Sequence, residues 1–450
     1  MATNVFDVVV VGLGPGGEAT AAELARAGLA VVGVDERLVG GECPYYGCIP
    51  SKMMIRASHV LAEGRRIAGL AGAADVRPDW GAVSDRIRDE ATDDWNDQVA
   101  VDRLEDAGAR FVRGHARLTG PRTVQVGDET FEASRGVVLN PGTAPAIPPI
   151  DGLADTPCWT NRDVMSIESV PGSLAVIGGG AIGAEIAQAL SRFGVRVTLL
   201  EVADRILAPE EPEASRLVTD VLAHEGLQVL SGVTIDSVSF DDGRFRIAVD
   251  GQDLDAEKLL VAAGRRPNLS DLGLDTVGLD PGARVIEVDE HMRAGEGLWA
   301  IGDVTGKGAF THVSMYQSGV CVRDILGQDG PVADYRAVPR VTFTDPEVGS
   351  VGMTEKQARG AGLEVRVGVT DLASSARGWI AREQGLVKLV EDADRGVLVG
   401  ATSVGPSGGE MLSMLTTAVH AEVPTATLRS MIYAYPTFHR AVEQALKDLA

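Results

Sequence analysis

The sequence predicts an α/β protein with two Rossmann-like dinucleotide-binding domains and a C-terminal α+β domain. A G-x-G-x-x-G motif occurs twice, each time between an apolar strand and an alanine-rich helix, whereas one such motif alone would be a weak signal. From about Val338 the pattern changes to strand-like alternation followed by two helical stretches. The chain has 450 residues, of which 45% are hydrophobic and 54 are glycines, and this suits about three domains with many tight βα turns.

The first motif lies in residues 5–36, which we expect to form a strand, a glycine-rich turn, a helix and a second strand. The glycines would admit the tight turn and let the backbone approach a pyrophosphate, and the helix N-terminus would offer N–H donors. They are Gly12, Gly14 and Gly17. The second strand ends in Asp35, whose carboxylate is expected to accept hydrogen bonds from a ribose.

The second motif repeats this order within residues 174–201, with a helix expected near 184–193. Its glycines are Gly178, Gly180 and Gly183. Glu201 ends the following strand and, like Asp35, stands about 18 residues after the third glycine. The chain is therefore expected to hold two nucleotides.

The segments around these motifs complete the predicted fold. Residues 80–107 are expected to form a charged packing helix, and the proline-rich stretch 144–150 a domain boundary. Short strands are expected at 111–117, 124–126 and 136–139. A buried strand within 259–268 runs into a turn with Gly264, and a strand at 298–303 ends at Asp303, where α/β sheets hold ligands.

Two cysteines, Cys43 and Cys48, lie in the segment GGECPYYGCIPSK at 40–52. A disulfide between them would close too short a loop to add much stability, and strained, accessible pairs are the reducible ones. If a helix begins near Ile49, its dipole favours the Cys48 thiolate, which is then the thiol to face an electron-deficient ring, with Cys43 as the outer thiol. The alternative is two ordinary reduced cysteines, which we also expect for Cys158 and Cys321.

The charge balance restricts the partners. A formal charge of -23 repels phosphate backbones and anionic membrane surfaces, so neither nucleic acid nor a membrane is an expected partner. The chain enters a strand almost at once, with no basic leader and no long apolar segment, which predicts a cytoplasmic protein. No metal site is expected.

These features together resemble the pyridine nucleotide-disulfide oxidoreductases, over essentially the whole chain. Segment 40–52 is similar to the family's redox loop, and 112–116 (VRGHA) to a segment whose backbone meets the FAD adenine. Segment 301–304 is similar to the flavin-ribityl motif, and 341–354 to the start of the dimerisation domain. The resemblance implies a homodimer that binds FAD and NAD, with NADP possible. It implies an FAD-binding domain at 1–145 continued at 266–335, an NAD(P)-binding domain at 146–265 and a dimerisation domain at 336–450.

The resemblance also implies roles for individual residues. The residues that match the FAD site are Gly12, Gly14, Gly17, Asp35, Lys52, His115, Ala116, Gly142 and Asp303. Those that match the nicotinamide cofactor site are Gly178, Gly180, Gly183 and Glu201, and Gly264 is a further expected cofactor-binding residue. Lys52 matches a lysine near flavin N5 that a glutamate, here Glu185, holds. Glu201 favours NADH, because a carboxylate accepts from a free 2′-hydroxyl and repels a 2′-phosphate.

The family pattern breaks near the C-terminus. Members carry a His-Pro-Thr-x-x-Glu segment whose histidine donates a proton in the partner subunit's active site, and here Tyr435 and Arg440 replace the histidine and the glutamate. Tyrosine titrates near pH 10 and is a poor proton shuttle at neutral pH. If the last helix begins near Thr437, His439 and Glu443 would lie on one face as a displaced dyad; otherwise they are ordinary surface residues.

Three functions follow. The first is an enzyme that oxidises NADH or NADPH and reduces a disulfide or a similar small acceptor through Cys43 and Cys48. The second is a quinone or metal-ion reductase or a transhydrogenase that needs no histidine shuttle. The third is a flavin-binding scaffold without turnover. The bulky Tyr45 and Tyr46 would narrow access to Cys43 or offer a stacking platform for a flat acceptor.

Overall fold

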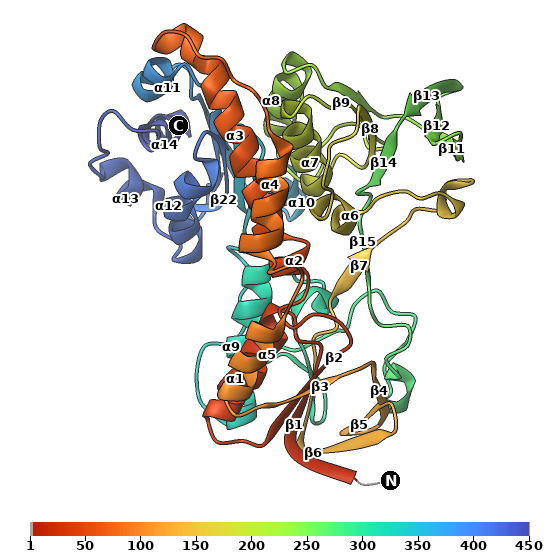
Figure 1. Cartoon of the computed structure of the whole chain (residues 1–450). Coiled ribbons are helices and arrows are strands. Elements are labelled where there is room, and N and C mark those ends of the chain that lie inside the picture. The colour runs from red at the N-terminus through yellow and green to blue at the C-terminus, as the bar shows by residue number, and fades with distance from the viewer. Residues whose placement is uncertain (1–2, 450) are drawn as a thin grey trace. The chain divides into compact units, whose positions relative to one another are not determined.

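The computed structural model describes residues 3–449, in two compact units (Figure 1). The first unit comprises the chain up to Met53, Ser84–Ala146 and Arg265–Asp334, and the second comprises Met54–Val83, Ile147–Gly264 and the chain from Tyr335 onward. Each of the two glycine motifs lies in a different unit. The domain bounds predicted from the sequence stay a prediction.

A mostly parallel sheet forms the centre of the first unit, in the order β16-β17-β6-β1-β2-β3. The strands β17, β6, β1, β2 and β3 pair in parallel, and β16 is antiparallel at the edge. A hairpin of β4 and β5 joins β6 in antiparallel fashion. The bounds are β1 (Thr3–Val11), β2 (Val31–Asp35), β3 (Arg110–Arg113), β4 (Ala116–Gly120), β5 (Thr123–Val126), β6 (Glu129–Leu139), β16 (Arg293–Gly295) and β17 (Leu298–Ala300).

Two long helices of this unit, α1 (Pro15–Arg26) and α9 (Thr311–Leu326), pack against each other (Figure 1). A Cβ on Gly16 would overlap the Ser314 side chain, so only glycine permits this approach. The hydroxyls of Thr20 and Ser318 hydrogen-bond across the contact at 2.8 Å. The remaining elements of the unit are α2 (Glu42–Tyr45), α5 (Gln98–Asp106), η3 (Leu274–Val277), η4 (Gly302–Thr305) and the antiparallel pair β7 (Thr143–Pro145) and β15 (Arg265–Pro267).

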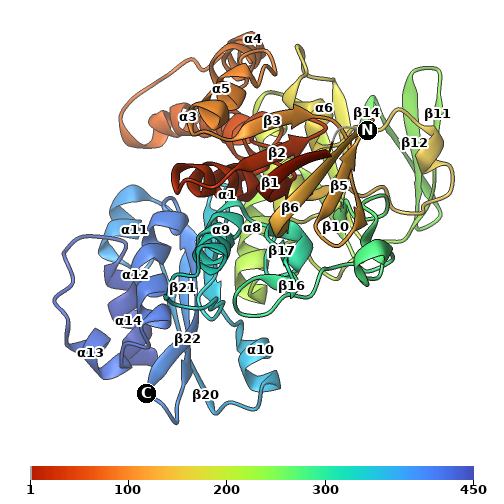
Figure 2. The same ribbon diagram turned by 90° about the horizontal axis from the view of Figure 1, so that it is seen from below.

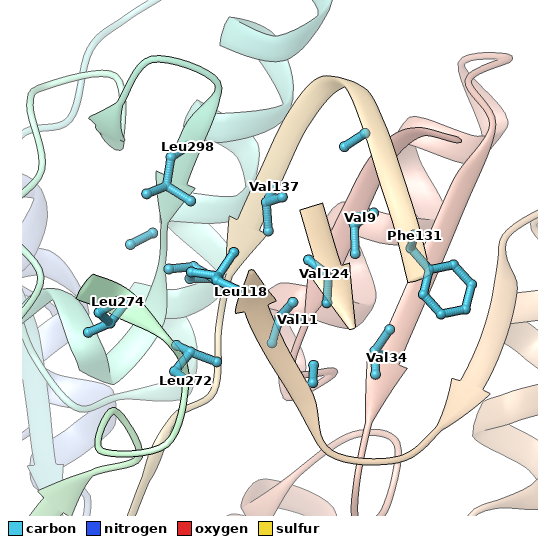
Figure 3. Close-up of a cluster of buried hydrophobic side chains, with 14 of the residues drawn as sticks. Val9, Val11, Val34, Leu118, Val124, Phe131, Val137, Leu272, Leu274 and Leu298 are labelled. Carbon is cyan, nitrogen blue, oxygen red and sulfur yellow. The ribbon is translucent and has the colours of Figure 1, made fainter. Parts of the chain in front are cut away.

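The hydrophobic core of the first unit joins the parallel strands to the β4–β5 hairpin and the loop near η3 (Figure 3). Val9, Phe131 and Leu139 are fully buried in it. Runs of β-branched residues in β1 and β2, such as 8–11 and 31–34, are buried on both faces, as expected for central parallel strands. This core fixes the carboxyl ends of β1 and β2, where the first glycine turn and Asp35 lie.

One sheet of the second unit consists of four parallel strands in the order β10-β9-β8-β14. These are β8 (Ser173–Ile177), β9 (Arg196–Glu201), β10 (Gln228–Ser231) and β14 (Lys258–Val261). Accompanying elements are η2 (Leu153–Asp155), α6 (Asn161–Met165), α7 (Ala181–Arg192), α8 (Pro212–His224) and the antiparallel meander β11 (Ile235–Asp241), β12 (Arg244–Val249) and β13 (Gln252–Ala256). Both glycine motifs thus stand where a parallel strand meets a helix, as predicted.

The C-terminal part of the second unit is a five-stranded antiparallel sheet in the order β18-β19-β22-β21-β20. In Figure 2, α12 and α14 lie on one side of this sheet and α10 on the other. Alternate residues of β21 bear this out, because Leu389 packs in the α12 and α14 cluster and Val390 packs with Ala358 of α10. The bounds are β18 (Pro339–Thr342), β19 (Glu347–Gly352), α10 (Glu355–Gly360), β20 (Val365–Asp371), α11 (Ala376–Ala381), β21 (Leu386–Asp392), β22 (Val397–Gly405), α12 (Gly408–His420), α13 (Thr425–Ser430) and α14 (Arg440–Asp448).

Several element predictions were wrong in detail. The helix expected over 80–107 is broken into α4 (Trp80–Arg86), a π-helical turn η1 (Ile87–Ala91) and α5, because residues 93–95 adopt positive φ angles. The strand expected at 111–117 is two strands, β3 and β4, interrupted at Gly114 and His115. Three helices rather than two end the chain, since the short α13 lies between α12 and α14.

Candidate active site

The redox loop lies against the first glycine turn. Gly40 N donates to the Leu13 carbonyl at 2.7 Å, and Gly41, with φ +67°, lies so close that a Cβ on it would come within 2.8 Å of Gly14 Cα. After Gly41 the chain forms the single-turn helix α2, which contains Cys43. The long helix α3 (Cys48–Leu70) then begins at Cys48 itself. The predicted place of Cys48 at a helix N-terminus is therefore confirmed, and Lys52 follows one turn later.

Cys43 and Cys48 are both free thiols that interact with each other, and Cys48 is the exposed one. A hydrogen bond from Cys43, then the Thr311 hydroxyl at 3.5 Å and the positive charge of Lys52, lower the pKa of Cys48 from 9.0 to about 6. The same hydrogen bond to Cys48, together with burial, raises the pKa of Cys43 far above its ordinary value. Both shifts favour the negative charge of the pair on Cys48, with Cys43 as the protonated donor.

Tyr45 and Tyr46, between the two cysteines, differ in exposure. Tyr45 is 6% exposed, and burial raises the pKa of its phenol to about 12. Its carbonyl accepts a hydrogen bond from the Trp95 indole at 3.2 Å. Tyr45 is thus a packing residue and cannot serve as a stacking platform, whereas Tyr46 is half-buried.

The two glycine turns have the same geometry. A Cβ on Gly17 would overlap the Gly12 carbonyl oxygen, and a Cβ on Gly183 would overlap the Gly178 carbonyl oxygen. Gly12 and Gly178 both have positive φ angles, +88° and +110°. Only glycine therefore fits these positions, and the resulting turns leave backbone free for a close approach by a pyrophosphate.

The acids that follow each turn also share one arrangement. Asp35 accepts from Leu13 N and from Arg37 N, both at 2.7 Å. Glu201 accepts from Gly179 N at 2.6 Å and from Ala203 N at 2.7 Å. Each carboxylate thus holds the second residue of its glycine turn. Burial raises the pKa of Asp35, and the two backbone N–H groups oppose this shift.

The predicted adenine segment lies beside Asp35. Gly114 N donates to the Asp35 carbonyl at 2.9 Å, and the His115 ring is 2.9 Å from the Glu36 carboxylate. Ala116 is buried at the start of β4. The structure therefore brings the glycine turn, Asp35 and the 114–116 segment together at one end of the sheet.

A polar chain reaches from Asp303 to the redox loop. The Thr143 hydroxyl donates to Asp303 at 2.6 Å and accepts from Arg265 at 2.7 Å, and Arg265 lies 3.5 Å from Glu42, next to Cys43. Sequence reasoning missed Thr143 and Arg265, because their partners are distant along the chain. The side-chain amide of Asn140, also missed, lies within hydrogen-bond distance of the first glycine turn, 3.0 Å from Gly17 N and 3.3 Å from the Gly12 carbonyl oxygen. The sequence offered one signal for Thr143, namely that it is a polar residue directly after the predicted cofactor-binding residue Gly142.

The remaining predicted cofactor residues have defined local surroundings, and their roles stay predictions. Gly142 and Gly264 have positive φ angles of +67° and +116°, with open space where a Cβ would stand. Gly180 caps the N-terminus of α7. Glu185 is buried in α7 and accepts from Phe343 N at 2.8 Å. Lys52 and Glu185 belong to different units, so their pairing stays a prediction.

The predicted dyad of His439 and Glu443 required a helix that begins near Thr437, and the structure does not show this helix start. The last helix begins at Arg440 rather than near Thr437, and His439 stands before its first residue. Glu443 instead pairs with Lys447 at 2.9 Å and with Arg440 at 3.4 Å. Within residues 3–449, His439 makes no side-chain hydrogen bond or ion pair. Tyr435 is 69% exposed, with the Arg440 guanidinium 5.4 Å above its ring.

Comparison with known proteins identifies the family of the chain. Residues 6–318 match the family described as pyridine nucleotide-disulphide oxidoreductase, and residues 338–446 match the dimerisation domain of that family. The chain belongs to the pyridine nucleotide-disulphide oxidoreductases. It is accordingly a flavoprotein oxidoreductase that uses FAD and NAD(P)H with a redox-active disulfide, and its dimerisation domain supports a homodimer with small-molecule substrates.

Named relatives cover nearly the whole chain. A mercuric reductase of Staphylococcus aureus is 31% identical over 98% of this chain and 82% of its own. A dihydrolipoyl dehydrogenase of Halobacterium salinarum is 33% identical over 98% of this chain and 95% of its own. The structure of the HOCl-induced flavoprotein disulfide reductase RclA from Escherichia coli, as a Cu(II) complex, superposes with a TM-score of 0.86 at 26% identity, covering 99% of both chains.

The two glycine turns fit the pyrophosphate groups of FAD and of a second nucleotide, because any side chain at Gly17 or Gly183 would overlap the turn itself.

The described residues contain no helix with both the length and the apolar character needed to traverse a bilayer.

Proposed function

We propose that this protein uses NADH to reduce a disulfide or a similar small acceptor, with Cys48 as the thiolate of the pair and Cys43 as the thiol that attacks the acceptor. The observation that supports the proposal is the hydrogen bond between the two cysteine side chains, which favours the negative charge on Cys48 and the proton on Cys43. When bound, FAD accepts a hydride from the nicotinamide and passes two electrons to the disulfide of the pair.

The geometry supports a reaction that needs no histidine. As Cys43 sulfur attacks an acceptor disulfide, its proton passes along the hydrogen bond to Cys48, and the acceptor leaves as a thiolate. That thiolate takes the proton back from Cys48. The Cys48 thiolate then attacks Cys43 sulfur, forming the enzyme disulfide and releasing the second acceptor thiolate, which is protonated by water. Overall, NADH, one proton and a disulfide give NAD and two thiols.

The preference for NADH rests on Glu201. Its carboxylate is fixed by two backbone N–H groups at the end of β9, the position from which an acid accepts from a ribose hydroxyl. A 2′-phosphate at that position would meet a negative charge. Roles for Lys52, Glu185 and Asp303 in holding the cofactors are proposed on the same positional basis.

A second candidate is a quinone or metal-ion reductase. It is favoured by one observation, namely that the segment around Tyr435 offers neither an imidazole at the expected place nor a His439–Glu443 pair. Acceptors that take electrons without prior proton donation would suit such a site. The mercuric reductases among the relatives make Hg(II) a natural acceptor to test.

An anaerobic titration with NADH or NADPH, followed by turnover with disulfides, quinones and Hg(II), tests these proposals. We expect NADH to reduce the protein more readily than NADPH, and disulfide turnover to vanish in both Cys43→Ser and Cys48→Ser. Quinone turnover that survives in both variants, without any disulfide turnover in the unaltered protein, would replace the first proposal by the second.

We also propose a cytoplasmic location, since four cysteines without a secreted-type framework suit a reducing compartment.

A further inference from the structure

A small cavity in the second unit lies beside Tyr435. Its walls come from the end of β20, the segment 374–377 that leads into α11, the residues 435–437 and one side of α14 from Arg440 to Lys447. Its volume is about 160 Å³, which is roughly five times the volume of a water molecule in the liquid. It therefore has room for a small polar group rather than for a large apolar ligand.

The walls of this cavity are strongly cationic. Arg377, Arg440 and Lys447 line it, and Glu443 is the single acidic residue among the lining residues. The local formal charge is thus +2, in a chain whose net charge is -23. Such a reversal of sign concentrates small anions at this site.

The single carboxylate does not neutralise the three cations. Glu443 is shared between Lys447 at 2.9 Å and Arg440 at 3.4 Å. Arg377 makes no ion pair within residues 3–449, and its guanidinium lies 5.6 Å from the centre of the Phe438 ring. At least one forked set of N–H donors therefore has no protein anion to bind.

A residue in the wall of the cavity also has a buried hydroxyl group without a partner. Thr370 lines the same cavity and is 6% exposed, and its hydroxyl oxygen is buried without a hydrogen-bond partner in the described part of the chain. A buried hydroxyl without a partner is unfavourable, and most such groups are satisfied by a protein group, a water or a ligand. Its neighbours Ser374 and Ser375 instead donate to backbone carbonyls within their own turn.

We propose that this cavity binds the carboxylate or phosphate group of a small molecule. The Thr370 hydroxyl and the guanidinium groups of Arg377 and Arg440 would donate to its oxygens, since arginine forks match planar or tetrahedral oxyanions. Lys447 adds a point charge. The proposal does not depend on which acceptor the dithiol reduces.

The test uses the full-length FAD-bound protein with saturating NAD, so that both nucleotide sites are filled. Binding of inorganic phosphate and, separately, of malonate is measured by isothermal titration calorimetry at low ionic strength. Arg377→Gln and Thr370→Val are the test variants, and Arg216→Gln, an exposed arginine of α8 outside the cavity, is the matched control. Thr370→Val removes the hydroxyl while keeping the shape of the side chain.

We expect saturable binding of at least one anion, weakened about tenfold or more by Arg377→Gln and severalfold by Thr370→Val, and unchanged by Arg216→Gln. Phosphate binding alone would assign the site to phosphate-bearing molecules, and malonate binding alone to carboxylates. Absence of saturable binding by both anions would overturn the proposal. Equal weakening by Arg377→Gln and Arg216→Gln would also overturn it, because binding would then reflect surface charge only.

Discussion

The hydrogen bond from Cys43 to Cys48 can be tested with two substitutions that differ by one donor. Cys43→Ala removes the group that lowers the pKa of Cys48 most, while Cys43→Ser keeps an O–H donor at the same place. Neither variant can form the disulfide, so Cys48 stays a single titratable thiol in both. Thr311 and Lys52 remain to stabilise the thiolate in each case.

The magnitude follows from the pKa. With a pKa of about 6, Cys48 is present at pH 7 as about ten thiolates for each thiol, whereas a pKa of 9.0 would give about one thiolate for each hundred thiols. The thiolate is therefore formed as pH rises through about 6 and is lost below it. We expect Cys43→Ala to move this midpoint upward by about one unit or more and Cys43→Ser to move it less, because the charged form loses a hydrogen bond only in the first variant.

The assay is the rate of Cys48 alkylation by iodoacetamide between pH 5 and 10, read for that cysteine by peptide mass spectrometry. Following the single site matters because Cys158 is half-buried and could also react, whereas Cys321 is buried. Since the thiolate is the nucleophile, the midpoint of the rate profile reports the pKa of Cys48. Identical midpoints for the two variants, or a midpoint near 9 in Cys43→Ser, would refute the reasoning that the donor on residue 43 sets the charge on Cys48.

Further predictions concern the proton, the nicotinamide and the flavin. Tyr435→Phe and His439→Ala should each change disulfide turnover by less than about twofold, because Cys48 takes the Cys43 proton; loss of a true general acid would cost about a hundredfold or more in steady-state assays. Glu201→Gln should raise the KM for NADH about tenfold in initial-rate measurements and reduce the discrimination against NADPH. Arg265→Met, which removes two hydrogen bonds to Thr143, should speed FAD release measured by flavin fluorescence. The matched Glu42→Gln removes the charge of the 3.5 Å ion pair while leaving both Arg265–Thr143 hydrogen bonds in place, and it should leave FAD release nearly unchanged.

The nucleotide-binding parts of the fold were predictable because their determinants are local. Each glycine turn depends on steric demands within a few residues, as the overlap between a Cβ on Gly17 and the Gly12 carbonyl shows. The acids Asp35 and Glu201 lie at a nearly fixed distance after their turns, since one strand and one helix separate them. Local rules failed at residues 93–95, where three successive non-glycine residues adopt positive φ and end the helix that apolar periodicity had indicated.

The C-terminal segment could not be predicted, because a helix start depends on a single turn of backbone. Helical spacing over 435–443 was consistent with a start near Thr437, yet the helix begins at Arg440, with His439 as its N-cap. Spacing shows which residues would share a face if a helix forms, and it carries no information on where the helix begins. Glu443 forms ion pairs with Arg440 and Lys447 rather than with the His439 imidazole, so the expected His439–Glu443 pair does not form.

The charge on Cys48 shows how local and distant determinants combine in one group. The helix start at Cys48 and the cation one turn later are evident from the sequence, but Thr311 contributes its hydroxyl from 263 positions away, which only the fold can bring there. The strongest contribution comes from Cys43, so the thiol that we propose to attack the acceptor is also the donor that stabilises the thiolate of its neighbour. A pair arranged in this way contains its own proton acceptor. The replacement of the expected histidine by Tyr435 is therefore compatible with disulfide exchange, provided that the released acceptor thiolate removes the proton that Cys48 has taken.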